Sequence, residues 1–267
     1  MIVTIITITY NDSEGLRRTI DSVRCQTCRD YQFIVMDGGS LDETKEVISD
    51  NEDIIYYWES KRDGGPFFGM NDAIKHSNGD YCIFMNSGDS FHDEFVIDKF
   101  CKANPCEDIL TGVAAEHVNG IVRPWQPAKE QDFSLRWFYR HSLSHQSSFI
   151  RTALLKSMEY DTEFRIVADW LFFMNALLIH NCTYRELPFY VSHYMDGGIS
   201  RDAGKAFAER DRAIVKYYGN RILRDCHTMQ YGVNRWDSLA KKVAPESKIG
   251  KVLCFIVECI LKLKGII

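Results

Sequence analysis

The sequence lacks a run of about 18 uninterrupted apolar residues, the length that a membrane-spanning helix needs. It also lacks the basic stretch and small-residue cleavage site of a signal peptide, because residues 1–9 are mostly β-branched and predict a strand. Basic residues are not in excess: 32 Lys and Arg stand against 37 Asp and Glu, for a formal net charge of -5. We therefore predict a chain that is neither secreted nor transmembrane and has no nucleic-acid partner.

The nine cysteines are odd in number and lie mostly in apolar runs, so they do not have the pattern of a disulfide framework. This usage favours buried, reduced thiols and a cytoplasmic protein. Only Cys25 and Cys28 have the spacing of a zinc or redox half-site, and no second pair or histidine cluster accompanies them. We interpret both as core-facing helix residues.

Residues 1–90 alternate between β-branched apolar runs and stretches with a helical pattern. The apolar runs predict strands at residues 2–9, 32–36, 54–58 and 81–85. Continuous apolar strands, unlike alternating ones, indicate a parallel sheet that crossover helices bury on both faces. The predicted fold class is therefore α/β.

A polar loop follows each of these four strands. The loops are Tyr10-Asn11-Asp12, Asp37-Gly38-Gly39-Ser40, residues 60–65 and Asn86-Ser87-Gly88-Asp89. Ligands bind outside the carboxyl ends of the strands in an open parallel sheet, so these loops predict a binding site at one edge. The sequence shows no Gly/Pro/Ser linker and no repeat, so no clean domain boundary can be drawn after them.

Two of these loops carry carboxylates that could serve a ligand. Asp37 can accept hydrogen bonds from a base or ribose, while the glycines after it permit positive φ and Ser40 can cap the next helix. Asp89 can hold Mg²⁺ or Mn²⁺, with diphosphate oxygens and water completing the coordination shell. The alternative for the Asp89 loop is an ordinary Asn/Gly/Asp turn.

An ordered set of motifs resembles the family 2 glycosyltransferases. The set comprises residues 5–12, Gln26-Thr27, residues 37–44, Gly79-Asp80 and residues 86–89, in that order. Two further segments, His145-Gln146-Ser147-Ser148 and the one from His193 to Ser200, resemble the branch that builds capsule, colanic-acid and lipopolysaccharide sugars.

The resemblance implies a GT-A fold, a Rossmann-like transferase of nucleotide-diphospho-sugars with a mostly parallel central sheet flanked by helices. The implied domain covers residues 1–246, with a nucleotide-sugar-binding half at 1–100 and an acceptor half at 101–246, and a C-terminal amphipathic helix follows at 247–267. The implied reaction is inverting transfer from a nucleotide-sugar donor, by preference a UDP-sugar, to a hydroxyl of a glycan or polyprenyl-linked acceptor in cell-surface polysaccharide synthesis.

The resemblance also implies roles for single residues. Those assigned to the nucleotide-sugar are Thr9, Tyr10, Asn11, Asp37, Gly38, Asp63, Asn86 and Ser87, and those assigned to the donor sugar or acceptor are His145, Gln146, Trp170 and His193. Asp89 corresponds to the family's metal-binding acid, so the implied cofactor is Mn²⁺ or Mg²⁺. Asn86 and Gly88 replace two acids of the family pattern, which leaves a catalytically impaired binding or assembly module as the alternative function.

Asp169 lies in Val167-Ala168-Asp169-Trp170, which resembles the element that carries the family's general base. An inverting transfer needs a carboxylate to take the acceptor's proton while that oxygen attacks the anomeric carbon. The alternative is that Asp169 is the N-cap of a helix over residues 169–180. A nucleotidyltransferase is disfavoured, because no Gly-rich basic loop follows the first strand to hold a triphosphate.

The last segment, residues 248–267, carries Lys251, Glu258 and Lys262 on one narrow helical stripe, with apolar residues over most of the rest. This pattern predicts peripheral contact with the inner face of the cytoplasmic membrane. A second subunit in a homodimer, or the helix's own domain, are the alternative partners.

Overall fold

The computed structural model describes residues 2–118, 120–195, 202–243, 249 and 251–252. The chain divides into two compact units, Met1–Ala213 and Ile214–Ile267. No helix among the described residues is both long and apolar enough to cross a membrane. The predicted boundary at residue 246 and nearly all of the predicted C-terminal helix lie outside the described residues, so both stay predictions.

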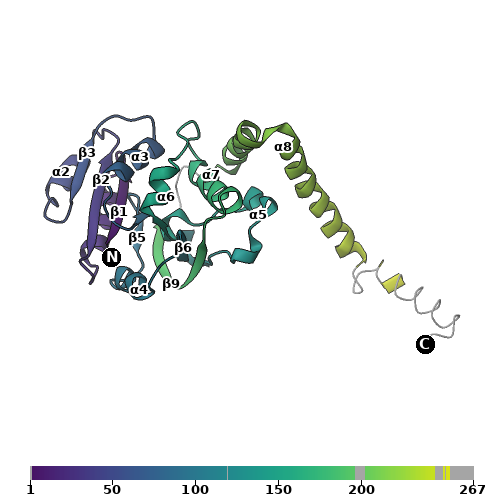
Figure 1. Cartoon of the computed structure of the whole chain (residues 1–267), viewed down its shortest axis with the longest axis horizontal. Coiled ribbons are helices and arrows are strands. Elements are labelled where there is room, and N and C mark those ends of the chain that lie inside the picture. The colour runs from purple at the N-terminus through teal and green to yellow at the C-terminus, as the bar shows by residue number, and fades with distance from the viewer. Residues whose placement is uncertain (1, 119, 196–201, 244–248, 250, 253–267) are drawn as a thin grey trace. The chain divides into compact units, whose positions relative to one another are not determined.

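Units of strand and helix make up the first half of the fold. Its elements are β1 (Val3–Thr9), α1 (Ser13–Arg24), β2 (Tyr31–Asp37), α2 (Thr44–Ser49), β3 (Tyr57–Ser60), α3 (Pro66–His76), β4 (Tyr81–Phe84), β5 (Ser90–Phe91) and α4 (Val96–Lys102). β1 pairs in parallel with β2 and β4, and β2 pairs in parallel with β3. The carboxyl ends of these four strands therefore meet at one edge (Figure 1), which confirms the predicted parallel α/β arrangement.

The second half extends the same sheet. Its elements are β6 (Ile109–Val118), β7 (Ile121–Trp125), η1 (Glu130–Asp132), α5 (Leu135–Arg140), η2 (His145–Ser147), β8 (Ser148–Arg151), α6 (Thr152–Ser157), α7 (Ala168–Met174), the π-helix η3 (Asn175–Ile179), β9 (Tyr184–Met195) and α8 (Ala203–Val243). Over the described residues the strand order is β3-β2-β1-β4-β8-β6-β9-β5, and β7 pairs with β6. β8 joins the two halves because it is antiparallel to both β4 and β6.

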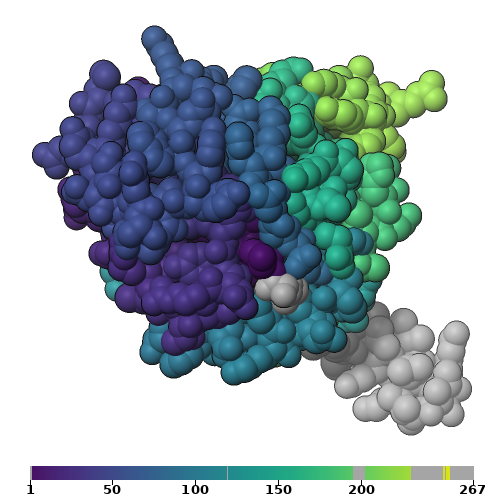
Figure 2. Space-filling view, turned by 60° about the vertical axis from the view of Figure 1, so that its left-hand side comes forward, coloured from purple at the N-terminus to yellow at the C-terminus, as the bar shows by residue number. Residues whose placement is uncertain are grey.

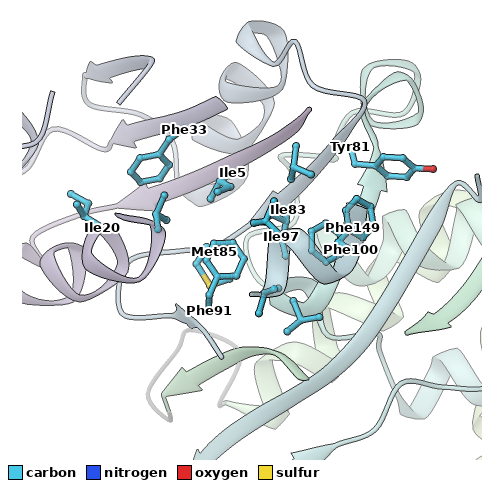
Figure 3. Close-up of a cluster of buried hydrophobic side chains, with 14 of the residues drawn as sticks. Ile5, Ile20, Phe33, Tyr81, Ile83, Met85, Phe91, Ile97, Phe100 and Phe149 are labelled. Atoms are coloured by element: carbon cyan, nitrogen blue, oxygen red, sulfur yellow. The ribbon is translucent and has the colours of Figure 1, made fainter. Parts of the chain in front are cut away.

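Helices cover both faces of the sheet. Ile5 of β1 and Phe33 of β2 belong to a buried cluster that also contains side chains of α1, α2 and α4 (Figure 3). Ile6 and Ile34 alternate with them and are equally buried, and α3 contacts β1 and β2. The surface of the first half (purple to blue) directly adjoins the teal and green surface of the second (Figure 2).

The structure corrects two local predictions in the first half. The third strand begins at Tyr57, since Ile54 and Ile55 lie before it and pack their side chains on the buried cluster. α1 ends at Arg24, so neither cysteine lies in a helix: Cys25 is exposed, while Cys28 lies in the loop that follows and packs on the buried cluster. The Gln26 side chain fixes this loop by hydrogen bonds with the backbone of residues 93 and 97.

Candidate active site

A cleft of about 710 Å³, here called the central cleft, opens at the carboxyl ends of β1 and β4. The first half of the chain lines it with Asp12, Arg18 and residues 86–89. The second half contributes Glu116, Trp125, residues 142–146, Ile166, Val167, Asp169, Trp170, Tyr194, Ala206 and Arg210. The cleft therefore lies where the two halves of the sheet meet.

The loop after β4 forms one wall of the central cleft. Gly88 has a φ of 93°, a left-handed conformation that glycine adopts without steric cost. The Ser87 hydroxyl donates to the Asp12 carboxylate at 2.7 Å, and the Thr19 hydroxyl donates to the backbone carbonyl of Asp89 at 2.7 Å. Side chains of α1 and of the residue before it thus hold this loop in place.

Asp89 is 8% exposed at the base of this wall. Burial raises the pKa of its carboxyl to about 8, and a hydrogen bond from the Gln146 side chain opposes the shift. The Asn86 Oδ1, on the same turn, is buried without a hydrogen-bond partner in the described part of the chain. Two protein oxygens are thus present for a hard cation.

The oxygens of Asp89 and Asn86 suit a cation that takes most of its ligands from substrate and water. Among the described residues, no three or more His, Cys, Asp or Glu side chains form a group that could hold a metal ion. Mg²⁺ commonly binds through one or two carboxylates together with substrate phosphates. The donor set therefore fits Mg²⁺ or Mn²⁺ bound together with a diphosphate.

Asp169 lines the opposite wall of the central cleft. α7 begins at Ala168 and its N-cap is Val167, so the alternative that Asp169 is the cap is wrong. Its Oδ1 accepts the backbone N–H of Trp170 at 2.8 Å. Burial raises the pKa of its carboxyl to about 6, while the Trp170 N–H and the Arg210 guanidinium favour the ionised form. The group is therefore a carboxylate at neutral pH and can accept a proton.

Arg210 lies beside this carboxylate. Its guanidinium carbon stands over the Trp170 ring, 5.1 Å from the ring centre, and its Nη1 donates to the Tyr139 carbonyl at 3.1 Å. The Trp170 indole N–H donates to the Phe138 carbonyl at 2.6 Å. These contacts fix the ring and the cation next to Asp169.

His145 also lines the cleft, as a buried side chain. Its Nε2 is 2.8 Å from the Tyr160 hydroxyl, and its ring stacks on Phe84 with the ring centres 4.5 Å apart. Burial lowers the pKa of His145 to about 3, so the imidazole is neutral. A neutral ring can orient a substrate hydroxyl but cannot balance an anion's charge.

The other residues assigned to the nucleotide lie after β1, β2 and β3, beside the central cleft but not in its lining. They are Thr9, Tyr10, Asn11, Asp37, Gly38 and Asp63. Asp37 is 2% exposed and accepts the backbone N–H and hydroxyl of Ser40 and the hydroxyl of Ser60. Ser40 does not cap α2, whose N-cap is Glu43; its hydroxyl donates to Asp37 and accepts the backbone N–H of Asn11.

Tyr10 and Gly38 lie side by side in this second group. Tyr10 is 62% exposed, and an added Cβ at Gly38 would lie 3.3 Å from the Tyr10 ring and 3.7 Å from the Asp63 carboxylate. The Asp63 carboxylate also accepts the backbone N–H of Gly65 at 2.9 Å. The Thr9 hydroxyl is buried without a partner in the described part of the chain. The exposed ring of Tyr10, the carboxylate of Asp63 and the backbone of Gly38 thus lie close together.

His193 does not lie in the lining of the cleft with the other predicted residues. Its Nδ1 is 2.8 Å from the Nε2 of His117, and its ring stacks on His92. The next residue of β9, Tyr194, lines the cleft instead. Successive side chains of a strand point to opposite faces, so His193 projects from the other face of the sheet.

Several residues of the cleft lining received no role from the sequence, among them Arg18, Glu116, Trp125, Tyr194 and Arg210. Three of them come together only because β6 pairs with both β7 and β9. No local pattern gives that pairing, since six helical segments and the strands β7 and β8 lie between β6 and β9. The two arginines carry no signal that separates them from ordinary surface cations.

Residues 4–177 match the model of glycosyl transferase family 2. An uncharacterized glycosyltransferase of Mycobacterium tuberculosis is 36% identical over 185 residues, 66% of this chain and 69% of that protein. The poly(ribitol-phosphate) beta-glucosyltransferase of Bacillus spizizenii is 28% identical over 191 residues, 67% of this chain and 30% of that protein.

Solved structures show the same fold. S. aureus TarS (residues 1–349) in complex with UDP-GlcNAc has a TM-score of 0.66 at 22% identity, covering 92% of this chain and 77% of that one. Glucosyl-3-phosphoglycerate synthase from Mycobacterium tuberculosis, in complex with Mn²⁺, UDP and phosphoglyceric acid, has a TM-score of 0.57 at 11% identity, covering 80% and 77%. The sheet described above is that of the GT-A fold, and the chain belongs to glycosyl transferase family 2.

Proposed function

We propose that this chain is an inverting, metal-assisted glycosyltransferase. It moves a sugar from a UDP-sugar to a hydroxyl of a glycan or lipid-linked acceptor in cell-surface polysaccharide synthesis, in the branch of capsule and lipopolysaccharide enzymes. One observation carries the proposal: Asp89 from the first half and Asp169 from the second line the same cleft. Membership of the family supports the reaction class.

The donor's nucleoside is assigned to the loops after β1, β2 and β3, and its diphosphate to the loop after β4. Asp37, Asp63 and Tyr10 present carboxylates and a ring at the first place, and the Thr9 hydroxyl and Asn11 lie beside them. Arg18 and Arg210 line the cleft and offer charge to a diphosphate. The solved complexes of TarS and of glucosyl-3-phosphoglycerate synthase with uridine nucleotides support the choice of UDP.

Asp89 and the Asn86 amide oxygen would hold Mn²⁺ or Mg²⁺ in this enzyme. When bound, the cation neutralises charge that develops on the leaving diphosphate. The Mn²⁺ in the glucosyl-3-phosphoglycerate synthase complex supports a divalent metal. Ser87 and Gly88 position Asp89 through the contacts of their loop with α1.

Asp169 takes the proton of the acceptor. As the acceptor oxygen bonds to the anomeric carbon, the bond from that carbon to the diphosphate oxygen breaks, and the proton passes to the Asp169 carboxylate. A single displacement inverts the anomeric configuration. The Trp170 backbone N–H donates to the Asp169 carboxylate, the Arg210 guanidinium favours its charge, and the neutral His145 lines the same cleft.

The second candidate function is a binding or assembly module that has lost catalysis. Asn86 and Gly88 at positions of the family's acids favour it. The two functions predict the same donor binding. They differ in turnover, because the module would bind UDP-sugar without releasing UDP.

Calorimetry of UDP with and without Mn²⁺ tests the donor site. Asp89→Asn should lose the dependence on Mn²⁺, at a cost of at least about tenfold in affinity. Asp98→Asn is the control, because Asp98 lies on α4 in an exposed ion pair with Lys102. Wild-type affinity of Asp89→Asn for UDP with Mn²⁺ would refute the metal site. UDP release from UDP-sugars by the wild-type protein then separates the enzyme from the module.

A further inference from the structure

The wall of the central cleft that β6, β7 and β9 form has no role in the mechanism above. Its side chains are Glu116 of β6, Trp125 of β7 and Tyr194 of β9. Glu116 pairs with Tyr194, and Trp125 pairs with Ala114, two residues before Glu116. Paired residues, and residues two apart, project from the same face of a sheet. The three side chains therefore form one surface, here called the β6–β9 platform.

Trp125 is the apolar part of the β6–β9 platform. It is 41% exposed inside a cleft, which is unusual for a large aromatic side chain and typical of a ligand-binding surface. Its ring centre is 6.4 Å from that of Tyr194, and the ring planes differ by 59°, so the two rings are not stacked. The paired residue, Ala114, has a side chain too small to fill the space beside the indole.

Glu116 and Tyr194 are the polar part. Burial and the Glu116 carboxylate raise the pKa of Tyr194, so the phenol keeps its proton and hydrogen bonds with that carboxylate. This contact orients Glu116, whose remaining oxygen lone pairs can accept further hydrogen bonds.

We propose that the β6–β9 platform is the acceptor saccharide subsite, and that it binds a pyranose ring. A pyranose has an apolar face of C–H groups, which packs on an indole, and hydroxyls at its edge, which donate to a carboxylate. The ring lies on Trp125 and donates to Glu116, with the reacting hydroxyl directed to Asp169. This inference rests on the proposed function, because it places the acceptor in the cleft that holds the donor.

Fluorine NMR of the full chain labelled with 5-fluorotryptophan tests the subsite. The probes are the methyl glycosides of glucose, galactose, mannose, rhamnose and N-acetylglucosamine, each titrated into the millimolar range with UDP and Mn²⁺ present, and glycerol is the polyol control. The Trp125 resonance is assigned by its loss in Trp125→Phe. We expect at least one glycoside to move that resonance, while Trp137, which is not part of the cleft lining, keeps its position.

Two variants sharpen this titration. Glu116→Gln removes the charged acceptor but keeps the shape, and should weaken the effective glycoside about tenfold. Val122→Ala is the matched control on β7, because Val122 pairs with His117 and projects from the other face of the sheet. The proposal would be overturned if no glycoside moved the Trp125 resonance, or if the resonances of all tryptophans moved alike. Equal affinity of the effective glycoside for Glu116→Gln and for the wild-type protein would also overturn it.

UDP binding to the same sample separates this inference from the proposed function. If UDP binds with Mn²⁺ and no glycoside moves Trp125, the subsite is refuted and the donor site stands. If a glycoside moves Trp125 and UDP does not bind, the platform binds saccharides and the proposed transferase function is refuted.

Discussion

Asp89 and Asp169 line one cleft, but different surroundings act on their carboxyl groups. Asp89 lies on a buried turn with the Gln146 side chain against it. Asp169 lies in the first turn of α7, where the Arg210 guanidinium and the Trp170 N–H favour its charge. The carboxyl of Asp169 therefore has a lower pKa than that of Asp89, and it is the one suited to accept a proton near neutral pH.

The pH dependence of turnover should report the Asp169 carboxyl. A general base works only when ionised, so kcat should rise with pH through about 6 and then level off, in line with its raised pKa. Asp169→Asn keeps the size of the side chain, and should lower kcat by about 10²–10⁴-fold and remove this rise. A pH–rate profile of both proteins checks the prediction. Near-wild-type turnover of Asp169→Asn, or retained anomeric configuration in the product, would contradict it.

Arg210 should set where that profile lies. Its positive charge favours ionised Asp169, so Arg210→Gln should raise the pKa of that carboxyl and move the rise in kcat to higher pH. Arg212→Gln is the control, because Arg212 faces Glu163 in an exposed ion pair. The same kinetics measure the effect. If kcat of Arg210→Gln rose at the same pH as kcat of the wild-type protein, the Arg210 guanidinium would act only on binding or folding.

Motifs predicted the cleft residues that follow strands or begin helices, but not those within β9. Asn86, Ser87, Asp89, Gln146 and Asp169 do line one cleft. His193 is not in the cleft lining, because the pairing of β9 with β6 sets which face of the sheet each side chain takes. A shift of one residue moves every side chain to the other face.

Strands made of a continuous apolar run were predicted with nearly the observed bounds. The strand predicted at residues 2–9 is β1 (Val3–Thr9), and the one predicted at residues 32–36 is β2 (Tyr31–Asp37). The helix predicted over residues 169–180 is instead α7 followed by the π-helical turn η3. Over a few residues an α-helix and a π-helix have nearly the same apolar periodicity, so the sequence does not distinguish the two helix types. The second half was harder to predict, because β8 and β9 find their partners far along the chain.

α4 should stabilise the junction between the halves through one aromatic contact. Phe100 stacks on Phe149 of β8, with ring centres 3.8 Å apart, and meets the edge of Tyr81 of β4. Phe100→Ala should lower the free energy of unfolding by about 3–5 kcal/mol, since the site is fully buried. Phe95→Ala, at an exposed position of the same segment, should change it by less than about 0.5 kcal/mol. Urea unfolding followed by circular dichroism compares them, and equal losses would contradict the assigned core.

At the scale of the whole molecule, one sheet runs through both halves, and the cleft lies at their junction. The proposed donor residues follow β4 and the proposed acceptor residues lie on and beside β6, and the single strand β8 pairs with both of these strands. The membrane contact proposed for residues 248–267 belongs to the other compact unit.

Ending the chain at residue 247 should separate catalysis from membrane contact. The shortened protein should bind UDP with Mn²⁺ as the full chain does, because the central cleft is lined by residues 12–210. It should no longer float with vesicles that contain anionic lipid, since the basic amphipathic segment is gone. Equal flotation of both proteins would favour a homodimer contact or docking on the chain's own domain.

The pairing of β6 with β9 also bears on how the protein is made. β9 pairs with β6 along one edge, and the residues that meet, such as Ile109 and Tyr184, are 75 positions apart. Until residue 195 has been synthesised, β6 keeps that apolar edge unpaired, and an unpaired edge is a template for another chain. Nascent or shortened chains that stop before Tyr184 are therefore expected to aggregate, and slower translation beyond Val118 should lower the yield of native protein.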